Sequence, residues 1–172
     1  MKKKLIFIFF LLSWVTVQAQ ERISNVVFEG NKKLVLQAVD SNLYVSGKLT
    51  SGDIIRSTCS GGSCSIEIEY KGRSVEVSIG DAILNLTVYE YDFSGDGDVE
   101  LVVINDFMDT SYLFIFSYSR GLIEKIFQYE VSYYKTEIDE NYIVYCLPSG
   151  PEGLWHYYKG YFWEMNPMKL EW

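Results

Sequence analysis

The stretch from Tyr91 to Val103 carries oxygen-bearing side chains at every second position of its central part. These side chains belong to Asp92, Ser94, Asp96, Asp98 and Glu100. Ca²⁺ takes about six to eight oxygen ligands, and the glycines between these residues allow the backbone to curl around an ion. Four carboxylates within nine residues also repel one another unless a cation lies among them. The sequence therefore predicts a calcium loop, with a metal-free polar turn as the alternative.

This loop departs from the EF-hand pattern and is flanked by strands. An EF-hand needs a bidentate glutamate at its twelfth position, and the twelfth residue counted from Asp92 is Val103. Leu84, Leu86 and Val88 alternate before the loop, and 101–104 is apolar after it. We therefore expect a strand–loop–strand site.

The loop resembles the calcium loops of integrin-type FG-GAP propeller repeats, whose pattern is Asp-x-Asp-x-Asp-Gly-x-x-Asp. Ser94 stands in place of the second acid, and Glu100 stands in place of the last. The resemblance implies that Asp92, Ser94, Asp96 and Glu100 bind Ca²⁺ through their side chains. It implies that Asp98 binds through its backbone carbonyl.

The elements that would position this loop are strands joined by tight turns. The runs 66–70 and 75–79 alternate apolar and polar residues around Lys71-Gly72, which predicts a β-hairpin. Arg120-Gly121 and Lys159-Gly160 separate two further pairs of runs, and glycine supplies the positive φ of such turns.

Earlier runs complete the predicted β-structure. We expect strands over 25–28, 33–39 and 42–45, with surface tips over 46–53 and 60–63. The predicted fold class is all-β, a single domain of antiparallel hairpins. They would form either an incomplete β-propeller-like assembly or a sandwich.

The N-terminus has the plan of a secretory signal peptide. Three lysines precede an apolar run over 5–17, and Val17-Gln18-Ala19 offers small residues to a signal peptidase. The run is shorter than the roughly 20 residues of a membrane-spanning helix, although an uncleaved anchor is the alternative. We expect a signal peptide over 1–19 and one β-rich domain over 20–172 that does not span a membrane. The run resembles export signals of Gram-negative Bacteroidota, which implies the periplasm or the exterior.

The chain has 172 residues and a net charge of −8. Removal of the three signal-peptide lysines leaves 12 basic residues against 23 acidic ones, a net charge of −11. This acidity argues against nucleic-acid binding and favours a basic partner.

Two of the three cysteines are close in sequence. Cys59 and Cys64 flank Ser-Gly-Gly-Ser, and an exported protein meets an oxidising compartment, so we predict a disulfide between them. Their spacing is not that of the redox motif Cys-x-x-Cys. Cys146 lies in an apolar run and is expected to be a buried free thiol.

The C-terminal part is rich in aromatic residues. Ordinary strand packing explains many of them, but Tyr and Trp are also common anchors at binding surfaces. The candidate partner-binding residues are Trp155, Tyr157, Tyr158, Tyr161 and Trp163. His156 is the only histidine, and no zinc cluster, phosphate-binding loop or nucleophile elbow accompanies it in the sequence. We therefore expect a protein that is not an enzyme.

Export, size and the single acidic loop together resemble the periplasmic lysozyme inhibitors that act as immunity proteins and are built as incomplete β-propellers. That resemblance implies a protein that captures or inhibits a partner such as a peptidoglycan hydrolase, with Ca²⁺ bracing the scaffold. The alternative is a glycan- or envelope-binding module that uses the C-terminal aromatic residues as a stacking platform.

Overall fold

The computed structural model describes residues 25–39, 44–60, 63–81, 85–107, 110–131, 135–147 and 150–165. Within these ranges the chain forms strands and turns and no helix, which confirms the all-β prediction. A search of the same ranges for a helix long and apolar enough to cross a bilayer finds none. The predicted signal peptide over 1–19 lies outside the described residues.

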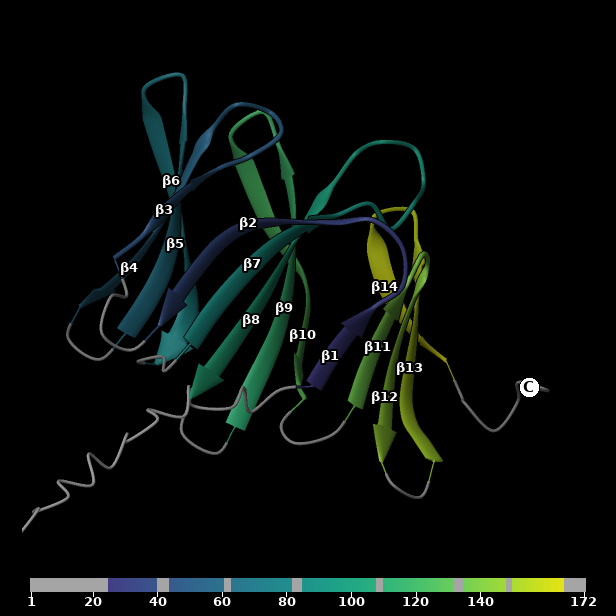
Figure 1. Cartoon of the computed structure of the whole chain (residues 1–172). Helices are drawn as coiled ribbons and strands as arrows, with labels where there is room; N and C mark the ends of the chain where they lie inside the picture. Colours follow the sequence, from purple (N-terminus) through teal and green to yellow (C-terminus); the bar gives the residue numbers. More distant parts are fainter. Residues whose placement is uncertain are drawn as a thin grey trace, which may run out of the picture.

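Three sheets lie side by side and pack face to face (Figure 1). Sheet 1 contains, in this order, β3 (Ser46–Lys48), β4 (Ile54–Ser60), β5 (Ser63–Tyr70) and β6 (Arg73–Asp81). Sheet 2 contains β10 (Leu122–Glu130), β9 (Thr110–Ser119), β8 (Glu100–Phe107), β7 (Asn85–Tyr91) and β2 (Lys32–Val39). Sheet 3 contains β1 (Asn25–Phe28), β11 (Lys135–Asp139), β12 (Tyr142–Leu147), β13 (Gly150–Tyr158) and β14 (Tyr161–Met165).

Each sheet is built on four strands that are consecutive in the chain and antiparallel, as in a propeller blade. The two N-terminal strands join the other two sheets. β2 pairs antiparallel with β7, and β1 pairs parallel with β11. The described chain is therefore an open, propeller-like stack of three sheets.

Two apolar cores fill the spaces between the sheets. The core between sheets 1 and 2 includes Ile66, Val88 and Phe116. The core between sheets 2 and 3 includes Ile115 and Ile143. Because sheet 2 is covered on both faces, β8 is buried along almost its whole length and does not alternate. The run 101–104 is apolar at every position for this reason.

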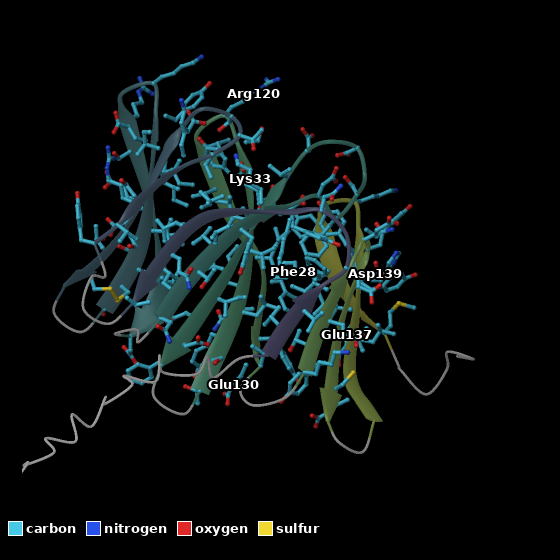
Figure 2. All side chains as sticks on the ribbon, viewed as in Figure 1. Phe28, Lys33, Arg120, Glu130, Glu137 and Asp139 are labelled. Carbon is cyan, nitrogen blue, oxygen red and sulfur yellow. A yellow bond between two sulfur atoms is a disulfide. The ribbon has the colours of Figure 1, made fainter. Side chains whose placement is uncertain are left out.

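The three basic-Gly pairs occupy equivalent places in the three sheets. Lys71, Arg120 and Lys159 have φ values of 49°, 51° and 53°, and each is followed by a glycine that also has positive φ. Each pair forms the two-residue turn of its sheet's last hairpin, so the predicted hairpins are confirmed. Figure 2 shows Arg120 at the tip of the β9–β10 hairpin.

One predicted strand is displaced along the chain. We expected a strand over 42–45 and a surface tip over 46–53, but residues 44 and 45 are not in a strand, and β3 begins at Ser46. Residues 42 and 43 lie outside the described ranges. Within β3, a Cβ at Gly47 would lie 2.2 Å from the carbonyl oxygen of Val35. The glycine thus permits close packing of β3 on β2.

Candidate metal centre and aromatic surface

The acidic loop joins β7 to β8 and curls around the carboxylate of Asp92. Its Oδ1 accepts hydrogen bonds from the backbone amides of Ser94 and Gly95 at 3.1 and 2.7 Å and from the Ser94 hydroxyl at 3.2 Å. Its Oδ2 accepts a bond from the Gly97 amide at 2.8 Å. Gly95 and Gly97 have φ values of 72° and 93°, so the loop uses both for conformations that other residues rarely adopt.

Asp96 and Asp98 lie on the exposed side of the loop. Asp96 Oδ1 accepts a hydrogen bond from the Asp98 amide at 2.9 Å. Hydrogen bonding from Ser94 and from the Asp98 backbone lowers the pKa of the Asp96 carboxyl below its usual range. Asp96 therefore carries a full negative charge at neutral pH.

Glu100 differs from the other acidic residues of the loop because it is buried, with 5% of its surface exposed. Its Oε1 accepts a hydrogen bond from the hydroxyl of Tyr157 in sheet 3 at 2.5 Å, and Oε2 accepts a long one from the Phe93 amide at 3.4 Å. Burial, with a smaller contribution from the nearby Asp92 charge, raises the pKa of Glu100. This carboxylate would be stabilised by a cation.

The donor set of the loop fits a hard cation in its chemistry. Ca²⁺ binds carboxylate and hydroxyl oxygens, and the glycines allow the loop to turn around an ion. A bound cation would also offset the cost of burying the Glu100 charge. In the described residues, however, no three His, Cys, Asp or Glu side chains already stand together as a ligand set. Asp92 is held by amides inside the loop and Glu100 by Tyr157, so binding would require these side chains to converge. The calcium site stays a prediction.

Two residues that sequence analysis did not assign to the loop fix its base. Phe93 is fully buried although it stands between Asp92 and Ser94, and its ring contacts those of Tyr91, Tyr157 and Phe162 at centroid distances of 4.7, 5.6 and 5.0 Å. Tyr157 adds the hydrogen bond to Glu100. An aromatic residue inside an acidic run was the available signal for Phe93. Tyr157 is 57 positions away from its partner Glu100, so no local sequence signal predicts their hydrogen bond.

A second buried carboxylate has a structural role. Glu90 is 4% exposed and accepts hydrogen bonds from the Thr50 amide and hydroxyl, each at 2.7 Å, and from Lys33 Nζ at 2.9 Å. These contacts join the β3–β4 turn to β2 and β7, so Glu90 fastens sheet 1 to sheet 2.

The five candidate partner-binding aromatics do not share one surface, which corrects that part of the prediction. Trp155 and Tyr157 are 8% and 9% exposed because they point into the core against sheet 2. Tyr158, Tyr161 and Trp163 are 54%, 49% and 61% exposed and point the other way. Successive side chains of a strand point to opposite faces of the sheet, which places Tyr157 and Tyr158 on different sides. Because only one face of sheet 3 packs on sheet 2, the residues on the other face are exposed to water.

Four exposed residues and the half-buried His156 form a continuous aromatic layer, which we call the outer aromatic face: Tyr142, His156, Tyr158, Tyr161 and Trp163. Tyr142 is opposite His156, which is opposite Trp163, and Tyr158 is opposite Tyr161. The His156 ring lies between those of Tyr142 and Tyr158, at centroid distances of 4.8 and 6.3 Å. The only histidine is thus part of an aromatic stack.

The opposite end of the stack is polar. The outer face of sheet 1 carries Arg56, Thr58, Ser65, Glu67, Glu69, Glu76 and Ser78. Arg56 pairs with Glu69 at 2.8 Å, and Ser65 hydrogen-bonds to Thr58 and to Glu76. A terminal face of a repeating stack is normally polar, because water covers it. Sheet 1 follows this rule. On sheet 3 the outer face is charged along β11, with Lys135, Glu137 and Asp139, and aromatic along β12 to β14.

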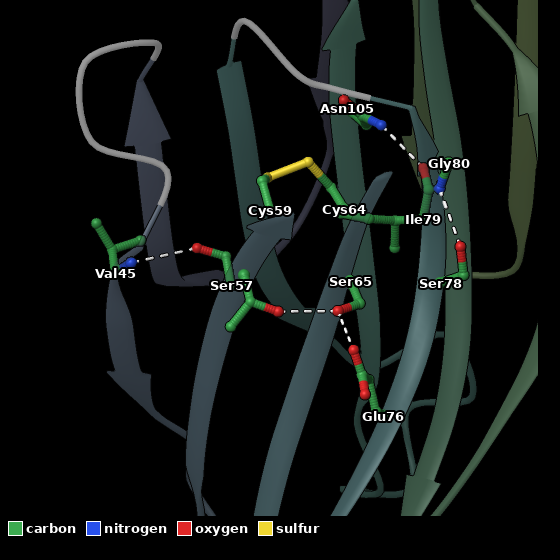
Figure 3. Close-up of a disulfide and its surroundings, with 11 residues drawn as sticks. Val45, Ser57, Cys59, Cys64, Ser65, Glu76, Ser78, Ile79, Gly80 and Asn105 are labelled. Atoms are coloured by element: carbon green, nitrogen blue, oxygen red, sulfur yellow. Dashed lines mark hydrogen bonds between the residues drawn. A yellow bond between two sulfur atoms is a disulfide. The ribbon is translucent and has the colours of Figure 1, made fainter. Parts of the chain in front are cut away.

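Cys59 and Cys64 form the predicted disulfide (Figure 3). They are directly opposite in the β4–β5 ladder, with Cα atoms 4.1 Å apart. Cys146 is a free, partly buried cysteine, and burial raises the pKa of its thiol.

We expect the disulfide to fix one hairpin and to add less to the free energy of unfolding than a bridge that closes a long loop would. The loop that it closes is short, so the unfolded chain loses little entropy. Replacing both cysteines by serine should lower the free energy of unfolding by less than about 3 kcal/mol. Intact-mass measurement should show two hydrogens fewer than the reduced chain. A fully reduced protein after purification without reductant would contradict the assignment.

No protein-family model, curated protein sequence or solved structure matches this chain.

Proposed function

We propose that this chain is an exported, non-enzymatic binding protein that captures or inhibits a protein partner such as a peptidoglycan hydrolase. The contrast between its two terminal faces is the observation that carries the proposal. The polar face of sheet 1 needs no cover, whereas Tyr158, Tyr161 and Trp163 leave large apolar area in water on sheet 3. Exposed aromatic patches of this kind mark interaction sites.

Charge supports a basic partner. The chain without residues 1–19 has a net charge of −11, and such a field speeds the approach of a cationic protein. Many lysozymes are basic, and the single acidic loop and open propeller-like stack fit the lysozyme-inhibitor resemblance. The disulfide suits an oxidising compartment such as the periplasm or the exterior.

Ca²⁺ has a structural role in this proposal. Asp92, Ser94, Asp96 and Glu100 would hold it through their side chains, and Asp98 through its carbonyl. The ion would neutralise the loop and join it to Tyr157 through Glu100. The aromatic face belongs to the same sheet as Tyr157, so the metal would brace the scaffold behind it.

The test is a pull-down from envelope extracts in the presence of Ca²⁺, followed by a hydrolase-inhibition assay on the captured protein. We expect a peptidoglycan hydrolase that binds one-to-one and loses activity. Capture of no hydrolase, or of one that stays fully active, would contradict the proposal.

The double variant Tyr161→Ala, Trp163→Ala should weaken that complex at least about tenfold, because aromatic anchors often contribute 2 kcal/mol or more each. Tyr44→Ala is the matched control, since Tyr44 is 67% exposed and does not belong to the outer aromatic face. Equal inhibition by the double variant and by the natural chain would place the interface elsewhere.

The ring stack of Tyr142, His156 and Tyr158 favours one second candidate, a glycan- or envelope-binding module. Sugar rings stack on flat aromatic surfaces of this type. Saturable binding of glycan strands that the same double variant abolishes, with no hydrolase inhibition, would support this candidate.

A further inference from the structure

The strand β14 forms an open edge of sheet 3. It pairs with β13 on one side, and no described strand pairs with its other side. Two of its side chains, Tyr161 and Trp163, are 49% and 61% exposed. The backbone groups along the open side of an edge strand are a template on which another strand can pair. One more strand can therefore add to sheet 3 at β14.

The last strands of the other two sheets carry protection that β14 lacks. The strand β10 has a bulge between Lys125 and Phe127. The strand β6 begins and ends with a charged residue, Arg73 and Asp81. Bulges and charged side chains keep edge strands from pairing. The strand β14 pairs with β13 without a bulge and has a single charged residue, Glu164. Of these three edges, β14 therefore has the least to prevent pairing.

The sequence that follows β14 has the pattern of one further strand. Apolar and polar side chains alternate strictly over residues 168–172: Met168, Lys169, Leu170, Glu171 and Trp172. This period of two is typical of a strand with one apolar face. The Asn-Pro pair at 166–167 is typical of a turn and separates this run from β14. Residues 166–172 lie outside the described ranges, and their pattern predicts a hairpin that begins with β14.

One antiparallel register suits both the charged and the apolar residues of this hairpin. It places Lys169 directly opposite Glu164. The apolar residues then form two further pairs on the outer aromatic face: Leu170 with Trp163, and Trp172 with Tyr161. A slip by one residue would turn the apolar side chains of the added strand to the opposite face. The charge pair and the apolar pattern therefore select the same register.

The surroundings of Glu164 favour a lysine beside it. Glu164 is exposed and forms no ion pair with another described residue. Burial, followed by the charges of Glu152, Glu164 and Glu130, raises the pKa of the Tyr129 hydroxyl. Carboxylates from β13, β14 and β10 thus act on the same ring. A cation opposite Glu164 would offset the repulsion among these charges.

We propose that residues 169–172 add to the open edge of β14 as the next strand of sheet 3, with Lys169 opposite Glu164. The added strand would pair the backbone groups of the edge and widen the outer aromatic face by Leu170 and Trp172. The connecting loop is short, so ordering this segment on its own neighbour costs less entropy than recruiting a strand from another molecule. The pairing needs no partner and does not rest on the proposed function.

Hydrogen exchange, followed in ¹H–¹⁵N spectra of the full exported chain and of a variant that lacks residues 168–172, tests the pairing. We expect the β14 amides that point away from β13 to exchange at least about tenfold more slowly in the full chain. Equal exchange of these amides in the two chains would overturn the proposal. Protection that rises with protein concentration would overturn it as well, because a second copy would then occupy the edge.

A charge reversal tests the register without removing the segment. Lys169→Glu should speed exchange of the same amides about twofold to fivefold, as expected when one cross-strand charge pair becomes repulsive. Addition of Glu164→Lys should restore slow exchange, because the pair is then reversed. Lys48→Glu is the matched control: this exposed lysine on β3 changes the net charge equally and should leave β14 unaffected. A double variant that exchanges as fast as Lys169→Glu would overturn the assigned register, and with it the proposal.

Discussion

Phe93→Ala is expected to lower the free energy of unfolding by about 3–5 kcal/mol, which is typical of a deleted core aromatic. The ring is fully buried and lies against Tyr91, Tyr157 and Phe162. Its loss would remove contacts from sheet 2 and sheet 3 together. The free energy of unfolding of a protein domain is about 5–15 kcal/mol in total, so this loss would be a large fraction of its stability.

Urea unfolding at neutral pH measures this effect. Tyr44→Ala is the control for loss of an aromatic ring in general, and we expect it to change stability by no more than about 0.5 kcal/mol because the side chain is mostly exposed. Phe93→Leu should fall between the two, since it keeps apolar volume. A Phe93→Ala loss below about 1 kcal/mol would mean that the base of the acidic loop is not anchored as described.

Phe93 also connects stability to the candidate metal site. It stands next to Asp92, whose carboxylate organises the loop, and its amide is hydrogen-bonded to Glu100. Burying this ring therefore fixes the start of the loop relative to the end. Sequence reasoning could identify the acidic residues from their spacing, but it could not show that Phe93, between Asp92 and Ser94, belongs to the core.

The hairpins were predictable because their signals are local. The turns at Lys71, Arg120 and Lys159 each place a basic residue and a glycine between two β-like runs, and all three occur where expected. Which side of a strand faces the core is not local. Trp155 and Tyr157 are inside and Tyr158 is outside only because sheet 2 lies against one face of sheet 3.

Glu100 illustrates the same limit at the candidate metal site. Its spacing from Asp92 places it as the last ligand in the resemblance, and nothing nearby in sequence indicates that it is buried. Burial follows from the approach of Tyr157 across the sheet interface. The residue thus has two roles that conflict: a core position that disfavours charge, and a loop position in which charge would bind a cation.

Glu100→Gln is therefore expected to change stability in opposite directions with and without calcium. In a chelator at neutral pH the variant should be more stable than the natural chain, because it removes a buried charge and keeps an oxygen for the Tyr157 hydroxyl. With Ca²⁺ in excess the order should reverse. An ion present at about 100 times its dissociation constant adds about 2.7 kcal/mol to the natural chain. The variant should lose most of that gain, and Asp96→Ala should lose it as well.

The pH dependence follows from the raised pKa of Glu100. The folded, metal-free protein holds this proton more tightly than the unfolded chain does, so stability should fall as pH rises from about 4.3 through the raised value. Glu100→Gln should lack that decline, whereas Glu124→Gln, at an exposed carboxyl on β10, should retain it.

Thermal unfolding of the three chains across this pH range, in chelator and in Ca²⁺, separates the two roles of Glu100. Identical melting of the natural chain with and without calcium would remove the metal from the proposal. The chelator result would still test burial of the charge, because that part of the prediction depends on Tyr157 and the core and not on an ion.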